Sequence, residues 1–237
     1  DATAVANLKK AGAILLGKTN LTEFAIGGSQ RYSPNRNPWD LDRFTGGSSS
    51  GSGSATAAFL CATSLGEDTG GSIRRPAAWC GLVGLRPSWG RVSRYGVMPG
   101  SWSMDQVGPI SRTVEDAAIT LEAIAGYDPK DPYSWDLPVP SFRRALDGDI
   151  KGIRVGAISE LVHSDIVDPE VRDAIIKAGA VLGEIYVAHQ SRKVAAAYDA
   201  DDMRTAASIE QKLAIASLVD MAIIVVAVVA MVSTWGV

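Results

Sequence analysis

The chain has 237 residues, of which 46% are hydrophobic and 21% are charged, a balance typical of a globular protein with a sizeable core. Its formal net charge of −3 argues against the broad basic surface of a nucleic-acid-binding protein. The two cysteines, Cys61 and Cys80, have no C-x-x-C spacing and indicate neither a zinc site nor a disulfide scaffold. Residues 1–18 lack the pattern of a secretory signal, and we therefore expect a cytoplasmic protein.

Predicted helices and strands alternate along the chain, which favours an α/β fold. In the first part of the chain we expect a helix over 2–11, a buried strand over 13–17, a short helix from Thr19 or Asn20 to Phe24 and a loop over 27–42. A helix over 54–62 and strands over 63–67, 80–85 and 103–111 are expected to follow. The last expected elements are a helix that Thr113 caps and Gly126 ends, a loop over 128–141, a strand over 152–159 and a helix over 168–183.

One segment near the end of the sequence, 221–232, is continuously apolar. It is shorter than the ~20 residues that a membrane-spanning helix needs. Extending it upstream to Leu213 would include Asp220. We therefore favour a buried strand or core segment over a membrane anchor, and a tail read out of frame is the third alternative.

The stretch "GEDTGGSIRRP" (66–76) has the residue types of a nucleophile turn. Two consecutive glycines, Gly70 and Gly71, do not suit a packed strand, so we expect a tight turn before Ser72. A serine nucleophile needs a base, hydrogen-bond donors for the oxyanion, and access to substrate. Glycines lack a Cβ, so their N–H groups can approach a substrate carbonyl closely.

The base for such a serine is not evident from residue types alone. His163 and His189 lie far downstream without acidic or glycine-rich neighbours, and a Ser-His-Asp arrangement is poorly supported. Lys18 directly follows the predicted buried strand, where desolvation would disfavour the charged form of its amine. A salt bridge from Lys18 to Glu23 or Asp68 is the alternative, and composition alone favours it.

Three blocks together give a specific resemblance to a known family. They are "GKTNLTEFA" (17–25), "GGSSSGSGSATAA…LGEDTGGSIRRPAAWCGLVGLRPSWGRVSRYGV" (46–97) and "SMDQVGPISRTVEDAAITLEAIAGYDPKDP" (103–132). A lone G-G-S would be a weak signal, but these blocks occur in the order found in the amidase signature family, which the chain resembles.

The resemblance implies a Ser–Ser–Lys triad. Ser72 corresponds to the nucleophile and Lys18 to the base. Ser48 corresponds to the serine with a cis peptide bond that bridges the two. The implied oxyanion donors are the main-chain N–H groups just before the nucleophile, at Thr69, Gly70 and Gly71, together with Ser72 itself.

Residues around the implied nucleophile have further expected roles. Asp68 is expected to orient the turn by accepting main-chain N–H bonds, and Arg74 to order the loop. Asp105 and Gln106 are expected to tie loops together. Glu67 stands where we expect Ser or Thr in the family, and its role is open.

The implied fold is a mixed, twisted β-sheet covered by helices on both faces. The resemblance covers 1–185, the amidase signature core, whereas 186–237 is an unrecognised segment that is divergent, truncated or out of frame. Family members carry a longer N-terminal region and a much longer C-terminal part. A partial domain would expose apolar surface and could need a partner chain.

The implied activity is hydrolysis of a small-molecule carboxylic amide, through a seryl acyl-enzyme, to an acid plus ammonia or an amine. We expect no metal, no cofactor and no nucleic-acid or membrane partner. The oligomeric state is not assigned from the sequence, and a homo-oligomer is one possibility. Residues 93–109 look more like those of general amidases than of the A subunit of glutamyl-tRNA(Gln) amidotransferase, which is the close alternative. Two further possibilities are a member that cleaves ureido or carbamate groups and a truncated inactive member that acts as a binding module.

Overall fold

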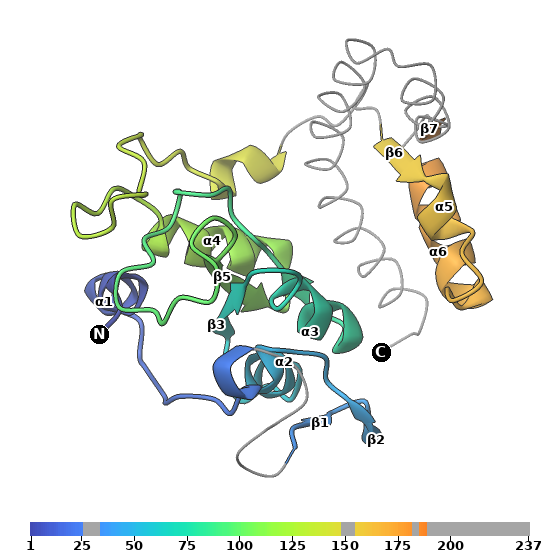
Figure 1. Cartoon of the computed structure of the whole chain (residues 1–237), viewed down its shortest axis with the longest axis horizontal. Helices are drawn as coiled ribbons and strands as arrows, with labels where there is room; N and C mark the ends of the chain where they lie inside the picture. Colours follow the sequence, from blue (N-terminus) through green and yellow to red (C-terminus); the bar gives the residue numbers. More distant parts are fainter. Residues whose placement is uncertain (26–33, 148–154, 182–184, 189–237) are drawn as a thin grey trace. The chain divides into compact units, whose positions relative to one another are not determined.

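The computed structural model describes residues 1–25, 34–147, 155–181 and 185–188 (Figure 1). The chain divides into two compact units, Asp1–Gly148 and Asp149–Val237, which are described separately. All residues of the implied catalytic site lie in the first unit.

The first unit combines short strands with helices of up to three turns. Its helices are α1 (Thr3–Lys10), α2 (Ser50–Ala57), α3 (Arg74–Trp79) and α4 (Val114–Ile124), with two 3₁₀ turns, η1 (Glu23–Ala25) and η2 (Arg143–Asp147). Its strands are β1 (Arg36–Asn37), β2 (Asp40–Phe44), β3 (Thr63–Asp68), β4 (Val83–Gly84) and β5 (Gln106–Ser111).

The core of the first unit is a three-stranded antiparallel sheet in the order β3-β5-β4. Every residue of the central strand β5 is buried. The register places Asp68, the last residue of β3, opposite Gln106, the first residue of β5. The turn that leads to Ser72 therefore begins where this strand pair ends.

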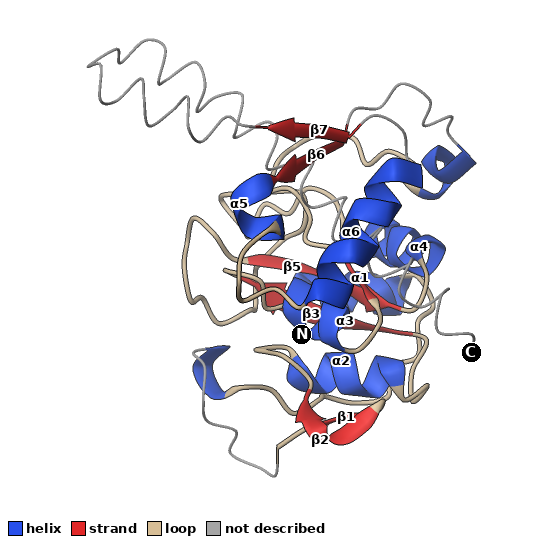
Figure 2. Ribbon diagram, turned by 90° about the vertical axis from the view of Figure 1, so that its right-hand side faces the viewer, coloured by secondary structure: helices blue, strands red, loops and turns tan. Residues whose placement is uncertain are grey.

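Helices cover both faces of this sheet (Figures 1 and 2). On one face, Ile110 of β5 packs with apolar residues of α2 and α3. On the other face, Val107 packs with apolar residues of α1 and α4. Side chains alternate between the two faces along a strand, so residues 107 and 110, which are three apart, point to opposite faces of the sheet. The predicted α/β class, with helices on both faces of a sheet, is confirmed.

Most predicted elements are present, with shifted ends. α1, β3 and α4 match the expected ranges closely, whereas β5 begins three residues after the start of the expected strand 103–111. α2 begins at Ser50, four residues before the predicted start, because packing overrides the low helix propensity of its serines and glycines. The strand predicted over 80–85 contracts to Val83–Gly84.

Three predictions for the N-terminal part are wrong. The helix expected from Thr19 or Asn20 to Phe24 is only the 3₁₀ turn η1 at Glu23–Ala25. The described residues 13–17 form no strand, and Ile14, Leu15 and Leu16 are 86%, 54% and 71% exposed. An apolar run indicates a tendency to be buried, but burial also needs a neighbouring element to pack against. The predicted loop 27–42 instead includes β1 and the start of β2, which pair as an antiparallel hairpin.

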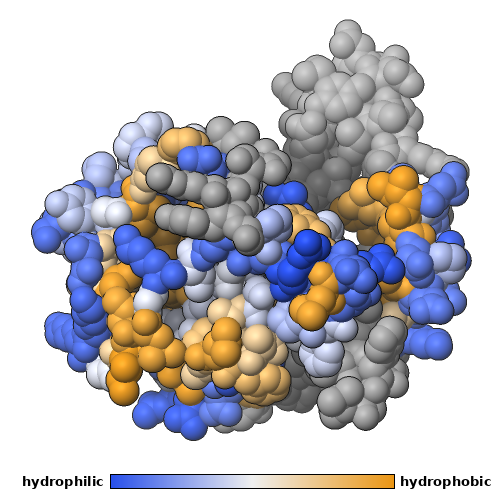
Figure 3. Space-filling model, turned by 90° about the horizontal axis from the view of Figure 1, so that it is seen from below, coloured by the Kyte–Doolittle hydropathy of each residue, from blue (hydrophilic) through white to orange (hydrophobic). Residues whose placement is uncertain are grey.

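Large hydrophobic side chains also lie at the surface elsewhere in the first unit. On the face drawn in Figure 3, patches of hydrophobic residues lie between hydrophilic ones. The exposed side chains include those of Phe24, Trp39, Leu41, Phe59 and Leu60.

The second unit contains a parallel pair of strands, β6 (Val155–Ile158) and β7 (Ile185–Ala188). Two helices, α5 (Ser159–Val162) and α6 (Pro169–Val181), lie between them in the sequence. α6 begins at a proline, whose fixed φ suits the first helical position. The predicted strand over 152–159 and helix over 168–183 are both present in part, whereas the apolar segment 221–232 lies outside the described residues. In the part of the chain that is described, no helix has the length and apolar character needed to cross a membrane.

We predict that Thr113→Ala destabilises the first unit by about 1 kcal/mol. The hydroxyl of Thr113 accepts the N–H of Asp116 at 3.0 Å and so caps α4, whose Leu121 and Ile124 lie in the core. Urea unfolding followed by circular dichroism measures the loss. Thr113→Ser keeps the cap and should unfold like the wild type, and equal stability of the alanine variant would contradict the cap assignment.

Candidate active site

Ser72 lies in a tight turn between β3 and α3. The chain leaves β3 at Asp68, turns through residues 69–72 and enters α3 at Arg74. Gly71 has a φ of 113°, a conformation that residues with a Cβ rarely adopt. The turn expected from the Gly-Gly pair is therefore present, and it holds Ser72 in a site where the residue is only 4% exposed.

The carboxylate of Asp68 organises this turn. Asp68 is fully buried, and its Oδ1 accepts the N–H of Gly71 at 2.6 Å. Its Oδ2 accepts the N–H groups of Ile73 at 3.1 Å and Arg74 at 3.3 Å. One side chain thus fixes the main chain on both sides of Ser72, as predicted from the residue types of the turn.

Two arginines compensate the charge of Asp68. Arg74 Nε lies 3.1 Å from Oδ2, and Arg86 Nε lies 3.5 Å from Oδ1. Burial alone would raise the pKa of Asp68, but the hydrogen bond from Arg74, the N–H of Gly71 and the charge of Arg74 together hold this pKa below its usual range. Asp68 is therefore a buried carboxylate that stays ionised.

Ser48 lies in the loop just before α2. The peptide bond between Gly47 and Ser48 is cis, as the resemblance implied, and Ser48 is 6% exposed. The next residue, Ser49, donates its N–H to the main-chain oxygen of Ser72 at 3.3 Å. A main-chain hydrogen bond therefore joins the two serine segments directly.

The segment after Lys18 runs alongside the same serine loop. Thr22 donates its N–H to the main-chain oxygen of Ser48 at 3.0 Å, and Gly51 donates its N–H to that of Asn20 at 2.9 Å. The hydroxyls of Thr19 and Ser52 lie 3.1 Å apart. At Gly51 the main chain of Asn20 fills the space of any Cβ, so this close approach requires glycine. The structure thus brings the segments that carry Lys18, Ser48 and Ser72 together.

Lys18 itself departs from the expectation of a desolvated amine. It is exposed, because the residues before it do not form the predicted buried strand. The alternative ion pair with Asp68 does not form either, since Asp68 pairs with Arg74 and Arg86.

The predicted oxyanion donors differ in their surroundings. Thr69 is half-buried, Gly70 is exposed and Gly71 is buried. The N–H of Gly71 is already donated to Asp68, so this hydrogen bond occupies one of the groups that the resemblance assigned to the oxyanion. Among the described residues, no group of three or more His, Cys, Asp or Glu side chains could hold a metal ion.

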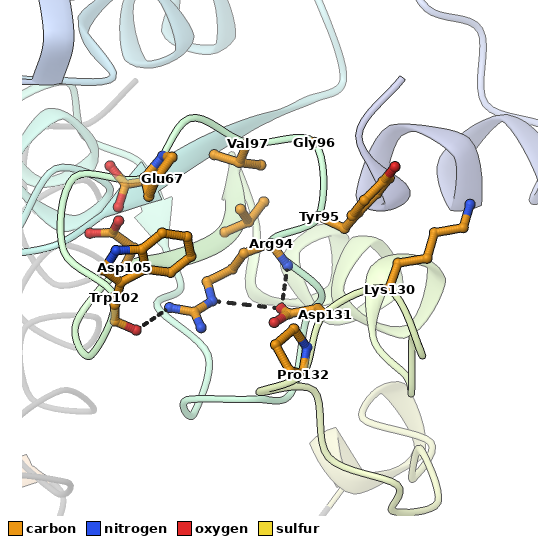
Figure 4. Close-up of a pocket in the computed structure, with 12 residues that line it drawn as sticks. Glu67, Arg94, Tyr95, Gly96, Val97, Trp102, Asp105, Lys130, Asp131 and Pro132 are labelled. Carbon is orange, nitrogen blue, oxygen red and sulfur yellow. Dashed lines mark hydrogen bonds and ion pairs between the residues drawn. The ribbon is translucent and has the colours of Figure 1, made fainter.

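A pocket of about 300 Å³ is lined in part by Glu67, near the end of β3, and no sequence motif pointed to it directly (Figure 4). Its lining residues do not include Lys18, Ser48 or Ser72. Glu67 and Asp105 form part of one wall. Arg94 contributes another part, with its guanidinium over the rings of Trp89 and Tyr133. Other lining residues are Tyr95, Val97, Trp102, Lys130 and Asp131. The unexpected Glu67 in the family motif was the single indirect signal.

We predict that Asp68→Asn lowers the free energy of unfolding by about 3 kcal/mol, because it leaves two arginines beside a neutral amide. Asp40→Asn, which removes an exposed pair with Arg43, is the control and should cost under about 0.5 kcal/mol. Urea titrations at neutral pH measure both. Since the pKa of Asp68 is lowered in the fold, its contribution is present above pH 3.8 and is lost as the pH falls through the lowered pKa. Equal losses in the two variants would contradict the anchoring role.

Comparison with known proteins places this geometry in a family. The family model described as "Amidase" matches residues 1–211. The A subunit of glutamyl-tRNA(Gln) amidotransferase from Syntrophobacter fumaroxidans is 51% identical over 209 residues, which are 84% of this chain and 43% of that protein. The protein of the same name from Moorella thermoacetica is 52% identical over 188 residues, 78% of this chain and 38% of that protein. The chain thus spans less than half the length of these curated relatives.

Solved structures agree with this assignment. The crystal structure of the glutamyl-tRNA(Gln) amidotransferase A subunit from Thermotoga maritima has a TM-score of 0.74 and 35% identity, and the match covers 94% of this chain and 53% of that one. Native peptide amidase from Stenotrophomonas maltophilia has a TM-score of 0.67 and 37% identity, with 79% and 41% covered. The chain belongs to the amidase signature family.

Proposed function

We propose that this chain carries the catalytic residues of an amidase that releases ammonia from a carboxylic amide, in the manner of a glutamyl-tRNA(Gln) amidotransferase A subunit. The observation that carries the proposal is the convergence of three sequence segments on the turn at Ser72. Main-chain hydrogen bonds tie residues 19–22 to the serine loop, and the serine loop to Ser72. Such bonds fix the position of a side chain before any substrate binds.

The proposed reaction begins with proton transfer toward Lys18. The uncharged amine of Lys18 takes the proton of the Ser48 hydroxyl, which takes that of Ser72 as Ser72 Oγ attacks the amide carbon. The C–N bond then breaks, and the same relay returns the proton to the leaving nitrogen, which departs as ammonia. Water attacks the resulting ester, releases the acid and restores the hydroxyl of Ser72.

The developing oxyanion would be held by main-chain N–H groups of the turn. Gly71 donates its N–H to Asp68, so we assign this role to Thr69, Gly70 and Ser72. In sites of this kind, loss of one donor costs about 10²–10³ in rate. Because the N–H of Gly71 is held by a buried carboxylate, the turn cannot rotate freely and its remaining donors keep their direction.

The exposure of Lys18 sets a condition on this mechanism. The proposed relay needs the uncharged amine, which a dry site favours and contact with water does not. We infer that bound substrate or a further part of the protein excludes water from Lys18 when the site is complete. The activity should therefore rise with pH on the acid side of its optimum.

The curated relatives favour ammonia transfer over general amide hydrolysis. Those named above are amidotransferase A subunits at 51% and 52% identity, whereas the peptide amidase is at 37%. This reverses our interpretation of residues 93–109 as typical of general amidases. On this proposal the amide is glutamine, the protein works in the cytoplasm, and a second subunit receives the ammonia.

A general amidase is the second candidate, and the structural comparison keeps it open. The peptide amidase and the Thermotoga maritima protein have similar identities to this chain, 37% and 35%, and TM-scores of 0.67 and 0.74. The family fold therefore separates the two activities poorly, and the substrate has to be measured.

We predict that a fluorophosphonate probe labels the folded protein and that Ser72→Ala abolishes this labelling. Ser103→Ala, at an exposed position, is the matched control and should be labelled like the wild type. Lys18→Met should reduce labelling by at least about a hundredfold, because the general base is lost, whereas Lys10→Met on α1 should not. Intact-mass spectrometry reads the adduct. Folded wild-type protein that stays unlabelled would exclude the proposed nucleophile.

The substrate is tested by ammonia release from glutamine, compared with release from peptide amides and aryl amides. We expect glutamine to give the highest kcat/KM and a second subunit to co-purify with the protein expressed in its full natural length. A preference for peptide or aryl amides, without a partner subunit, would support the general amidase instead.

A further inference from the structure

The hydroxyl of Thr69 contacts two carboxyl groups at once. Its Oγ1 lies 3.0 Å from Glu67 Oε1 and 2.6 Å from Asp105 Oδ1. A hydroxyl carries a single hydrogen, so it can donate to only one of these oxygens at a time. The other contact needs a hydrogen that comes from a carboxyl group.

The surroundings decide which carboxyl group carries that hydrogen. Asp105 is 4% exposed, and its Oδ2 accepts the N–H groups of Gly100 and Ser101, each at 2.7 Å. Both N–H groups need an acceptor, so Oδ2 of Asp105 carries no hydrogen in this arrangement. Asp105 also makes the shorter contact with Thr69, as expected for a bond to a charged acceptor. The proton therefore belongs to Glu67.

Electrostatics support the same assignment. Burial, followed by the negative charge of Asp105, raises the pKa of Glu67 from 4.5 to about 7, and the charge of Asp68 contributes in the same direction. Because this pKa is raised in the fold, protonated Glu67 stabilises the protein fully below pH 4.5, and the contribution is lost as the pH rises through about 7. Glu67 lines the pocket, so its proton can exchange with solvent (Figure 4).

We propose that Glu67 is a positioning residue of the active site, which in its protonated form donates to Thr69 and, through Thr69, links the nucleophile turn to Asp105. The proposal rests on the amidase function inferred above. The hydrogen bonds run in one direction, from the Glu67 carboxyl to the Thr69 hydroxyl and from this hydroxyl to the Asp105 carboxylate. Thr69 also supplies one of the assigned oxyanion donors, so this chain of bonds acts on the reacting atoms through the main chain.

Ionisation of Glu67 would break this arrangement. Two carboxylates would then compete for the one hydrogen of Thr69, and their like charges would repel each other. Two cations also line the pocket. Arg94 Nε lies 3.6 Å from Asp131, and among the described residues Arg94 Nη2 has no hydrogen-bond partner. Lys130 lies over the ring of Tyr95. The N-cap of α2 contributes the uncharged Ser49, which bonds to the main chain of Glu67.

The test compares pH profiles of amide hydrolysis for the wild type and its variants. In the wild type we expect kcat/KM to fall by about tenfold above pH 7. This is the effect expected from losing the hydrogen bond that the Glu67 carboxyl donates to Thr69. Glu67→Gln keeps a donor that does not ionise and should lose this alkaline fall. Glu115→Gln, at an exposed pair with Arg143, is the control and should keep the wild-type profile. Glu67→Leu should show the lower value across the whole range. An alkaline fall that persists unchanged in Glu67→Gln would overturn the proposal.

A second measurement separates this inference from the proposed function. In the Ser72→Ala protein, which needs no activity, carboxyl ¹³C NMR should show one glutamate titrating near pH 7, absent in Glu67→Gln. If this signal instead titrates near 4.5 while the wild type hydrolyses amides, the inference fails and the proposed function stands. If the signal titrates near 7 and no amide is hydrolysed, the proposed function fails, whereas the assignment of the proton to Glu67 beside Asp105 stands.

Discussion

The structure of the site depends on one buried carboxylate. Asp68 ends the strand β3 and holds the main chain on both sides of Ser72, so the position of this serine is set by the end of a sheet strand. Removing such a charge from water is costly, and two arginines together with three main-chain N–H groups compensate it. This compensation favours the observed turn, because each donor that leaves would weaken the stabilisation of a charge in the interior.

The serine loop adds a second constraint, which acts through the main chain. Ser49 donates its N–H to the main-chain oxygen of Ser72, and its hydroxyl contacts the main chain of Glu67. Gly51, in the first turn of α2, donates its N–H to the main-chain oxygen of Asn20, in the segment that follows Lys18. The three segments of the implied triad are therefore joined by hydrogen bonds that do not involve the triad side chains.

The local sequence predicted those features that depend on local chemistry. The cap at Thr113, the turn at Gly71 and the anchoring by Asp68 follow from residue types and spacing, and all are present. The predictions failed where a distant neighbour decides the outcome. The apolar run 13–17 was expected to be buried, and Lys18 after it to be desolvated, but burial depends on which element packs there. Similarly, the proton on Glu67 depends on Asp105, which approaches through the pairing of β3 with β5.

Joining the three segments through their main chains has a consequence for which side chains can vary. These hydrogen bonds use peptide N–H and C=O groups, so they do not depend on the identity of most side chains along the segments, with Gly51 as the exception. The pocket wall at Tyr95, Val97 and Trp102 belongs to another stretch, which contacts the turn through the hydrogen bond between Thr69 and Asp105. Residues of this wall can therefore be exchanged without breaking the bonds that hold the turn.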